Sequence, residues 1–360
     1  MPGVYISYPF CAQKCTYCNF ASGVSSRELE RQYLDALRAE IASANFPWRP
    51  ETVYLGGGTP SRLDSRELEE ILGSIPGYPW REATLEVAPG GLTPEQAAAW
   101  VRAGINRVSL GVQSFVAREL ARTGRKHTAE IVASEVEMLR QAGLTNINID
   151  LIAGLPSQTM ASWRESLVWI EKLEPPHVSV YMLEIDEDSR LGSEVLLNGK
   201  RYGAPEIPSD ELIAELYETA VGELARMGIL RYEISNFARP GFESAHNLKY
   251  WRLEPYLGFG ADAHSFDGVE RWQNVETAAE YVARSPKLRS MPANCSEERF
   301  FVGLRLMDGI RPNPEEWTRF EAPISRFLAE GLLTRDGDKL RLTNRGVLLS
   351  NEVFAEFITA

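Results

Sequence analysis

The alternation of two sequence patterns over residues 25–183 constrains the fold more than any other feature. Short apolar segments predict strands, and they alternate with longer segments in which apolar residues recur at the helical period. The strands are expected at Thr52–Leu55, Thr84–Val87, Arg107–Val112, Asn146–Ile152 and His177–Leu183, and capping signals at Ser25–Glu28, Asp64–Glu67 and Thr93–Gln96 predict helix starts between them. Such alternation builds βαβ units around a parallel sheet. Because there is no internal dinucleotide-binding fingerprint, the pattern favours a barrel, or part of one, over a doubly wound sheet.

Polar side chains recur at or near the carboxyl ends of these strands. They are Thr59, Glu86, Gln113 and Asp150. Each has an ordinary explanation, since Glu86 could lie at an exposed edge and Asp150 could pair with a lysine. In barrels, however, the carboxyl ends of the strands carry the chemistry. We therefore expect these residues, together with Arg125, to share one site.

Three of the four cysteines lie in one short loop, with the spacing Cys11-x3-Cys15-x2-Cys18. Three thiolates can hold three corners of a cubane iron–sulfur cluster, which leaves the fourth iron open to a small molecule. A structural zinc site is the first alternative, and it would need a fourth ligand such as His246 or His264. Three buried structural thiols are the second alternative, which the short loop disfavours. Cys295 lies far along the chain and is expected to be inert.

A glycine run, Gly56-Gly-Gly-Thr-Pro60, follows the first of the predicted strands directly. By itself such a run is often only a tight turn. At the carboxyl end of a barrel strand, glycines also let the backbone approach a ligand without interference from side chains. The run could then bind the ammonium and carboxylate groups of an amino acid.

Composition and charge restrict the classes of partner and compartment. The net charge of −12 argues against nucleic acid as the main partner, because phosphate contacts need a basic face. No apolar run approaches the roughly 20 residues of a membrane span, and no signal peptide is visible. Few cysteines, mostly clustered, fit a reducing cytoplasm, where thiolates stay free to bind metal. We expect a cytoplasmic protein with one large domain and one small one.

The last 70 or so residues follow a different plan from the rest of the chain. Helical patterns near Ser296–Met307, Glu315–Phe320 and Pro323–Glu330 precede a predicted hairpin over Leu332–Leu342, and Thr343 caps a final helix. Helix, helix, hairpin, helix is a winged-helix plan. Residues 290–360 hold nine basic and eleven acidic side chains, so packing or partner docking is favoured over DNA binding. We expect the chain to divide into a partial-barrel domain with the cysteine loop over residues 1–230, a connecting region over residues 231–288 and a small winged-helix-like domain over residues 289–360.

Two of the four histidines, His246 and His264, lie near aromatic residues and glycines. They are candidates for ligand or acid–base roles, although a lone histidine is more often structural. His127 and His177 are expected to be structural.

The cysteine loop, with its aromatic Tyr17, resembles the cluster loop of radical S-adenosylmethionine (SAM) enzymes. Within that superfamily, several stretches look like the oxygen-independent coproporphyrinogen III oxidase-like branch. They are Gly56–Pro60, Leu85–Val87, Ser109–Phe115, Ile149–Pro156 and Tyr232–Phe237. The resemblance covers nearly the whole chain. It implies an incomplete (β/α)6 TIM-like barrel with a small C-terminal α+β domain.

The resemblance also implies roles for individual residues. Cys11, Cys15 and Cys18 look like ligands of a [4Fe–4S] cluster whose open iron is chelated by SAM. Tyr5, Gly57 and Glu86 look like contacts to that SAM, whereas Gly58, Thr59, Gln113, Arg125 and Asp150 look like contacts to a second small-molecule site. Tyr17 also counts among the expected SAM contacts, without assignment to either site. SAM is a cationic amino acid joined to a ribose, so carboxylates, polar backbone groups and an arginine for its own carboxylate would bind it.

The branch contains dehydrogenases and the haem chaperones of the HemW family, and two features favour the chaperones. Phe20 stands where the dehydrogenases have a fourth cysteine, and few residues precede Cys11. His246-Asn247-Leu-Lys-Tyr250-Trp251 looks like a motif associated with haem binding in the chaperones. The chain departs from the family at Ser7, usually histidine, and at Asp262, usually glycine. The second departure puts a charge close to His264.

Two functions from different classes follow from this resemblance. The first is a carrier that binds haem or a porphyrin and transfers it to apo-haemoproteins; membrane-surface association and a homodimer are further expectations of this reading. The second is an oxygen-independent coproporphyrinogen III dehydrogenase, in which a 5′-deoxyadenosyl radical drives decarboxylation of propionates. Phe20 favours the carrier. The haem ligand is expected among His246, Asn247, Tyr250, Trp251 and His264.

Overall fold

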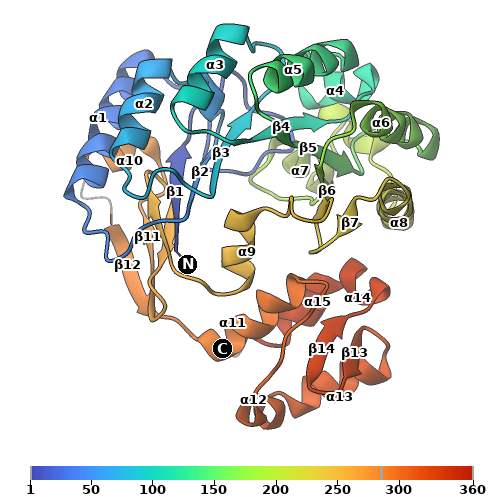
Figure 1. Ribbon diagram of the computed structural model, residues 1–360. Coiled ribbons are helices and arrows are strands. Elements are labelled where there is room, and N and C mark those ends of the chain that lie inside the picture. Colours follow the sequence, from blue (N-terminus) through green and yellow to red (C-terminus); the bar gives the residue numbers. More distant parts are fainter. Residues whose placement is uncertain (1, 284–286, 359–360) are drawn as a thin grey trace.

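The computed structural model describes residues 2–283 and 287–358, and its centre is a set of six parallel strands in sequence order. These are β1 (Gly3–Tyr8), β2 (Thr52–Gly57), β3 (Glu82–Val87), β4 (Arg107–Gln113), β5 (Asn146–Ala153) and β6 (His177–Met182). Helices follow and cover them on the outside (Figure 1): α1 (Arg27–Ser43), α2 (Ser65–Gly73), α3 (Pro94–Arg102), α4 (Ala117–Thr123), α5 (Ala129–Gln141), α6 (Met160–Leu173) and α8 (Asp210–Arg226). The predicted partial (β/α)6 barrel is confirmed.

The barrel stays open because β1 and β6 pair with other strands instead of with each other. On one side β1 pairs with β9 (Tyr256–Phe259), followed by β10 (His264–Phe266), β11 (Glu270–Asn274) and β12 (Lys287–Pro292). On the other side β6 pairs antiparallel with β8 (Asn236–Ala238), which pairs with β7 (Leu230–Arg231). Residues beyond 230 therefore extend the same sheet at both edges.

The strands alternate between apolar residues that pack against the helices and polar residues that face the barrel interior. Val53, Leu85, Val108, Ile149 and Val178 are completely buried in the apolar layer. The polar layer includes Tyr54, Thr84, Ser109, Asn148 and Ser179, which line a cavity of about 20 Å³. That volume suits about one water molecule. Several of these polar groups are hydrogen-bonded to one another, as Asn148 Nδ2 is to Ser109 Oγ at 2.7 Å and to Ser179 Oγ at 3.0 Å.

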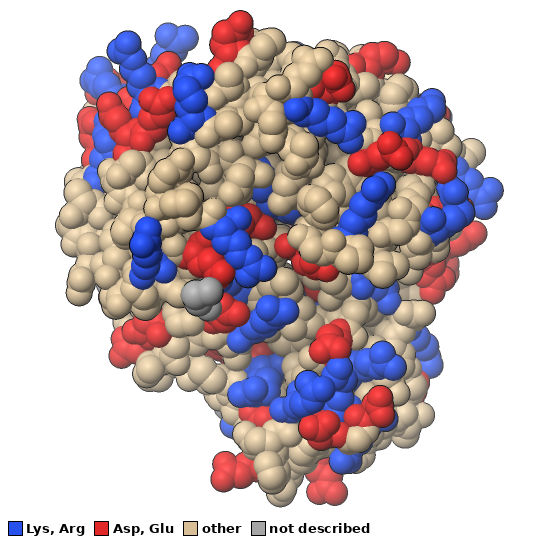
Figure 2. Space-filling view, viewed as in Figure 1, with Lys and Arg blue, Asp and Glu red and all other residues tan. Residues whose placement is uncertain are grey.

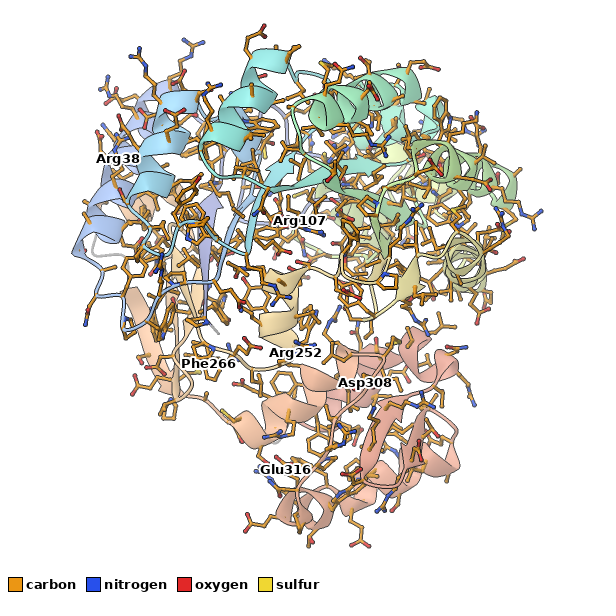
Figure 3. All side chains as sticks on the ribbon, viewed as in Figure 1. Arg38, Arg107, Arg252, Phe266, Asp308 and Glu316 are labelled. Carbon is orange, nitrogen blue, oxygen red and sulfur yellow. The ribbon has the colours of Figure 1, made fainter. Side chains whose placement is uncertain are left out.

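A short helix, α9 (Ala245–Trp251), closes the amino-terminal end of the barrel. The Glu82 carboxylate, at the start of β3, accepts hydrogen bonds from the amide N–H groups of Ala245 (2.8 Å) and His246 (2.9 Å). The Ser244 hydroxyl donates to the same carboxylate at 3.2 Å. Arg107 lies in the barrel above α9 (Figure 3) and donates to Asn146 Oδ1 at 2.8 Å. The Glu82 carboxylate thus fixes the N-terminus of α9, which closes this end of the barrel as a plug.

The segment between β6 and α8 crosses the opposite end of the barrel. It contains α7 (Arg190–Leu196) and the 3-10 turn η2 (Arg201–Glu206). The amide of Leu191 donates to the Thr16 carbonyl at 2.8 Å, and Asn19 Nδ2 donates to Asp186 Oδ2 at 2.6 Å. These bonds attach the segment to the cysteine loop, so it lies over the mouth of the barrel.

The C-terminal unit follows the predicted helix, helix, hairpin, helix order. It comprises α11 (Cys295–Phe301), the 3-10 turn η3 (Gly303–Arg305), α12 (Pro314–Arg319), α13 (Glu321–Ala329), β13 (Leu333–Asp336), β14 (Lys339–Leu342), α14 (Asn344–Leu348) and α15 (Ser350–Ala355). The rings of Phe300, Phe320 and Phe357 pack against one another in its core, and those of Phe300 and Phe357 are stacked. Arg305 joins the unit to the barrel, because it pairs with Glu233 at 3.4 Å and lies 4.5 Å from the Trp251 ring centroid.

The surface carries charges of both signs, and acidic and basic side chains are interspersed on the face shown in Figure 2. Within the part of the chain that the structure describes, no helix is long and apolar enough to cross a membrane.

Replacing Glu82 should destabilise the fold through α9. In Glu82→Ala, two amide N–H groups and the Ser244 hydroxyl lose a buried acceptor. Leaving buried donors unpaired should lower the free energy of unfolding by about 2–4 kcal/mol, measured by urea denaturation. Glu82→Gln keeps one acceptor oxygen and should lose about half as much. The exposed Glu28→Ala is the matched control, and equal stabilities for all three variants would contradict the assigned role.

Candidate functional site

The cysteine loop follows β1 and is closed by backbone hydrogen bonds. The Cys11 amide donates to the Gly23 carbonyl, and the Gly23 amide donates to the Pro9 carbonyl, both at 2.9 Å. All three thiols are free and partly exposed. Ser22 Oγ lies 3.8 Å from Cys11 Sγ and 4.0 Å from Cys18 Sγ, so at least these two sulfur atoms face the same point. Ser22 was not among the predicted site residues, although it is only four residues beyond Cys18.

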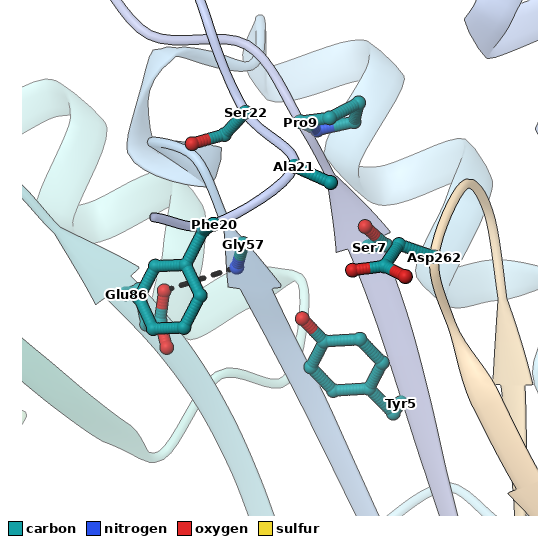
Figure 4. A pocket seen from close by; sticks show the side chains of 9 residues that line it. All are labelled: Tyr5, Ser7, Pro9, Phe20, Ala21, Ser22, Gly57, Glu86 and Asp262. Carbon is teal, nitrogen blue, oxygen red and sulfur yellow. Dashed lines mark hydrogen bonds between the residues drawn. The ribbon is translucent and has the colours of Figure 1, made fainter. Parts of the chain in front are cut away.

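A pocket of about 110 Å³ opens beside this loop at the carboxyl ends of the strands (Figure 4). Its lining consists of Tyr5, Ser7, Pro9, Phe20, Ala21, Ser22, Gly57, Glu86 and Asp262. The structure thus brings together Tyr5, Gly57 and Glu86, which the sequence predicted for one ligand. It adds Ser7 and Asp262, the two departures from the family pattern, to the same wall. Phe20 lines the pocket and is 66% exposed, so an apolar ring stands at its rim.

Glu86 is a half-buried acid in the wall of this pocket. Its carboxylate accepts a hydrogen bond from the Tyr54 hydroxyl at 2.9 Å and from the Gly57 amide at 3.1 Å. Burial raises the pKa of Glu86 to about 7, and the nearby negative charge of Asp150 adds to the rise, while the two hydrogen bonds oppose it. Near neutral pH, Glu86 can therefore hold or release a proton, or pair with a cation that restores its charge.

The glycine turn uses its amide groups inside the fold. The Gly58 amide donates to the Tyr8 carbonyl at 2.7 Å, and the Thr59 amide donates to the Phe10 carbonyl at 2.9 Å. The Gly57 amide is bound to Glu86. A Cβ on Gly58 would lie 2.7 Å from the backbone N and O atoms of Phe10, so only glycine allows this approach. Because these N–H donors are already used, the turn would present its carbonyl oxygens to a ligand. Carbonyl oxygens suit an ammonium group better than a carboxylate.

A second group of predicted residues lies around Arg125. Its guanidinium donates to the Gly111 carbonyl at 2.6 Å and to the Tyr17 hydroxyl at 3.4 Å. Within the described ranges, Arg125 Nε and Gln113 Oε1 are buried without a hydrogen-bond partner. Such atoms are costly unless something pairs with them. They therefore fit a polar ligand that has both donor and acceptor groups.

Asp150 belongs to the same end of the barrel but is already bonded by the protein. Its carboxylate accepts from Asn148 Nδ2 at 2.7 Å and from Ser109 Oγ at 3.2 Å. Burial raises its pKa, and these hydrogen bonds oppose the rise. Asp150 is thus a fixed carboxylate whose charge acts on both Glu86 and Arg125.

The predicted haem-binding motif lies at the opposite end of the barrel from the thiols. His246 is 1% exposed, its Nδ1 pairs with Thr52 Oγ1 and its Nε2 with the Tyr250 hydroxyl, both at 2.8 Å. Burial, followed by the charge of Lys249, lowers the pKa of His246 to about 3. Asn247 lines the small interior cavity, and Trp251 packs under Arg305. In this conformation neither ring nitrogen of His246 is free to bind iron.

His264 has the opposite environment. It begins β10, directly after the loop that carries Asp262, and it is the one exposed histidine of the four. Because β9 is parallel to β1 and β10 runs back along β9, His264 lies at the same end of the sheet as the cysteine loop. His127 and His177 are buried, as expected.

The cysteine loop and its neighbours do not form a site for a single metal ion among the described residues. Among the residues that the structure describes, no three His, Cys, Asp or Glu side chains form a group that could hold one ion. A tetrahedral zinc site would need four such ligands, and the nitrogens of His246 are taken. A cubane presents its irons at separate corners, so its thiolates lie farther apart than the ligands of one ion.

Comparisons with known proteins show what the chain is similar to. Residues 5–170 match the radical SAM superfamily model, and residues 294–349 match the HemN C-terminal domain. Proteins named heme chaperone HemW from Lactococcus lactis and Escherichia coli are 34% and 33% identical to this chain. The alignments cover 98% and 99% of the chain, and 96% and 97% of those proteins.

Among solved structures, coproporphyrinogen III oxidase (HemN) from Escherichia coli, described as a radical SAM enzyme, has the same fold. The TM-score is 0.83 at 21% identity, over 99% of this chain and 90% of that one.

The raised pKa of Glu86 predicts a pH-dependent stability that Glu86→Gln should remove. The folded pKa of about 7 exceeds the ordinary value of 4.5, so the unfolded chain loses this proton first as pH rises. Glu86 therefore costs stability progressively between those two pH values, by about 3 kcal/mol in full. The difference in free energy of unfolding between Glu86→Gln and wild type should therefore rise by about 2 kcal/mol in favour of the variant as the pH is raised from about 5 to about 8.

Urea denaturation of both proteins at the two pH values measures this gain. Glu95→Gln, which changes an exposed glutamate of α3, is the control and should follow wild type. Parallel curves for wild type and Glu86→Gln would show that Glu86 is fully ionised in the fold.

Proposed function

The chain belongs to the HemW family of the radical SAM superfamily, and we propose that it is a haem chaperone that binds haem and transfers it to apo-haemoproteins. The observation that carries the proposal is the similarity to proteins named heme chaperone HemW over almost the whole length of both chains. Membership of the radical SAM superfamily implies SAM and a [4Fe–4S] cluster. The cytoplasm, where thiols remain reduced, is the compartment in which such a protein would work.

We propose that Cys11, Cys15 and Cys18 hold the cluster. The contacts of both Cys11 Sγ and Cys18 Sγ with Ser22 Oγ support the proposal that these thiols face one shared cluster. A [4Fe–4S] cluster held by three thiolates supplies an iron that a small molecule can chelate. The adjoining pocket would receive that molecule, because it begins at Ser22 and continues to Tyr5, Gly57 and Glu86.

SAM is the ligand that the chemistry of the surrounding residues favours. It carries a sulfonium, an ammonium and a carboxylate. Glu86 and the carbonyl oxygens of the glycine turn suit the cationic groups. The neighbouring residues Tyr17, Gly58, Thr59, Gln113, Arg125 and Asp150 form the second group, in which Arg125 suits a carboxylate.

For haem, the accessible candidate ligand is His264. Its ring is exposed, and no hydrogen bond to that ring is made within the described part of the chain. His246 would first have to break its bonds to Thr52 and Tyr250. Haem on His264 would lie at the cluster end of the barrel, near Asp262.

Removing one thiolate should abolish the cluster without unfolding the protein. After anaerobic reconstitution, Cys15→Ser should contain less than about a tenth of the wild-type iron and acid-labile sulfide, because two thiolates cannot hold a cubane. Cys295→Ser, a thiol at the start of α11, is the matched control and should retain wild-type content. Equal loss in both variants, or none in Cys15→Ser, would contradict the ligand assignment.

A haem titration separates the two histidines. His264→Ala should lose or shift the Soret band of bound haem, because it removes the exposed imidazole. His246→Gln should keep the band and lower the free energy of unfolding by about 1–3 kcal/mol, since buried hydrogen bonds are lost. Loss of the band only in His246→Gln would show that α9 opens to bind haem.

Transfer of haem from the loaded protein to an apo-haemoprotein tests the chaperone function itself. Anaerobic conversion of coproporphyrinogen III to a vinyl product by the wild type would identify a dehydrogenase instead.

A further inference from the structure

Asp262 has a backbone conformation that residues other than glycine rarely adopt. It stands in the loop between β9 and β10 with φ of +59°, in the left-handed region. Aspartate is one of the few residues that tolerate this region, and then at a cost relative to glycine. A residue kept in such a conformation points to a use for its side chain.

The surrounding structure fixes the Asp262 carboxylate in the pocket wall. Its amide donates to the Val275 carbonyl at 2.8 Å, and Gln273 Nε2 donates to its Oδ1 at 2.7 Å. Figure 4 shows the carboxylate beside Ser7, directed into the pocket. Throughout the described residues, no hydrogen bond is made to Oδ2. One oxygen is therefore anchored and the other faces the pocket.

The charged residues that line the pocket have a single sign. They are Glu86 and Asp262, and no lysine, arginine or histidine is among the nine lining residues. Glu86 belongs to β3, on one side of β1 in the sheet. Asp262 belongs to the loop between β9 and β10, on the other side of β1. A pocket flanked by two carboxylates attracts a cation and repels an anion. The charge of Asp262 also reaches Tyr5, whose pKa is raised mainly by burial and by Glu86, with Asp262 adding to the rise.

We propose that Asp262 is a specificity-determining residue, whose carboxylate acts with Glu86 to select a positively charged ligand. The inference rests on the proposed SAM site and names what that site recognises. The site therefore prefers SAM, which carries a positively charged sulfonium, over S-adenosylhomocysteine, which carries a neutral thioether. The anchored carboxylate supplies this selectivity from the wall opposite Glu86.

Equilibrium dialysis of the anaerobically reconstituted full-length protein tests the proposal. Dissociation constants for SAM and for S-adenosylhomocysteine are measured in wild type and in Asp262→Asn. Asparagine keeps the shape and tolerates positive φ, so only the charge changes. The preference for SAM over S-adenosylhomocysteine should fall by about tenfold, as expected for one partly buried charge near another. The affinity for S-adenosylhomocysteine should change by less than about twofold.

Two further variants keep the result interpretable. Asp262→Gly removes the charge and relieves the backbone, so it should lose the same selectivity while its melting temperature rises. Asp336→Asn, which changes an exposed residue at the end of β13, makes the same charge change far along the chain and should behave as wild type. An unchanged ligand preference in both Asp262 variants would overturn the proposal.

The outcomes separate this inference from the proposed function. If wild type binds SAM and Asp262→Asn discriminates equally well, only the role of Asp262 fails. If wild type does not bind SAM, the SAM site and the role of Asp262 fail together. If the selectivity changes as expected but haem neither binds nor transfers, the chaperone function alone fails.

Discussion

The pairing of β1 with β2 is the interaction on which the site depends. Their parallel register brings Tyr8 beside Gly57, and the Gly58 and Thr59 amides continue the pairing onto the Tyr8 and Phe10 carbonyls. The backbone of the cysteine loop is thereby attached to the glycine turn. Since a Cβ at Gly58 would lie within 2.7 Å of Phe10, the absence of a side chain permits this attachment. The thiols, the pocket and Glu86 then follow from the positions of these two strands.

The polar layer inside the barrel gives its two ends different properties. Around the interior cavity of about 20 Å³, Asn148, Ser109 and Ser179 are hydrogen-bonded to one another, whereas Thr84 Oγ1 has no hydrogen-bond partner among the described residues. At the carboxyl end, Gln113 and Arg125 keep buried atoms without partners in the described structure, and the pocket beside the thiols opens to solvent. Unpaired buried groups cost free energy unless a ligand pairs with them. The pocket beside the thiols, together with the unpaired atoms of Gln113 and Arg125, therefore marks the carboxyl end as the one that can receive a ligand.

Local signals predicted the elements, whereas contacts between distant segments decided the details. Asp64 and Thr93 cap helices as expected, but α1 is capped by Ser26, one residue later than the start of the predicted box. Glu86 was identified because barrels place chemistry at strand ends. The burial of His246 could not be predicted, because Thr52 and Glu82, which hold it, lie more than 160 residues away in sequence. Asp262 was recognised as unusual, but only the fold shows that it shares a pocket with Ser7 and Glu86.

The environment of His246 also determines what haem binding by α9 would require. A neutral imidazole with both nitrogens bonded joins Thr52 to Tyr250, so it acts as a structural connection in the plug. Freeing one nitrogen would cost roughly 1 kcal/mol for each bond, in addition to the contacts of Glu82 with the helix N-terminus. Trp251, at the other end of α9, contacts Arg305, which also pairs with Glu233. Any ligand that displaces α9 must therefore disturb the junction with the C-terminal unit, whereas a ligand on His264 leaves that junction intact. Binding at the two histidines would thus have different consequences for the C-terminal unit.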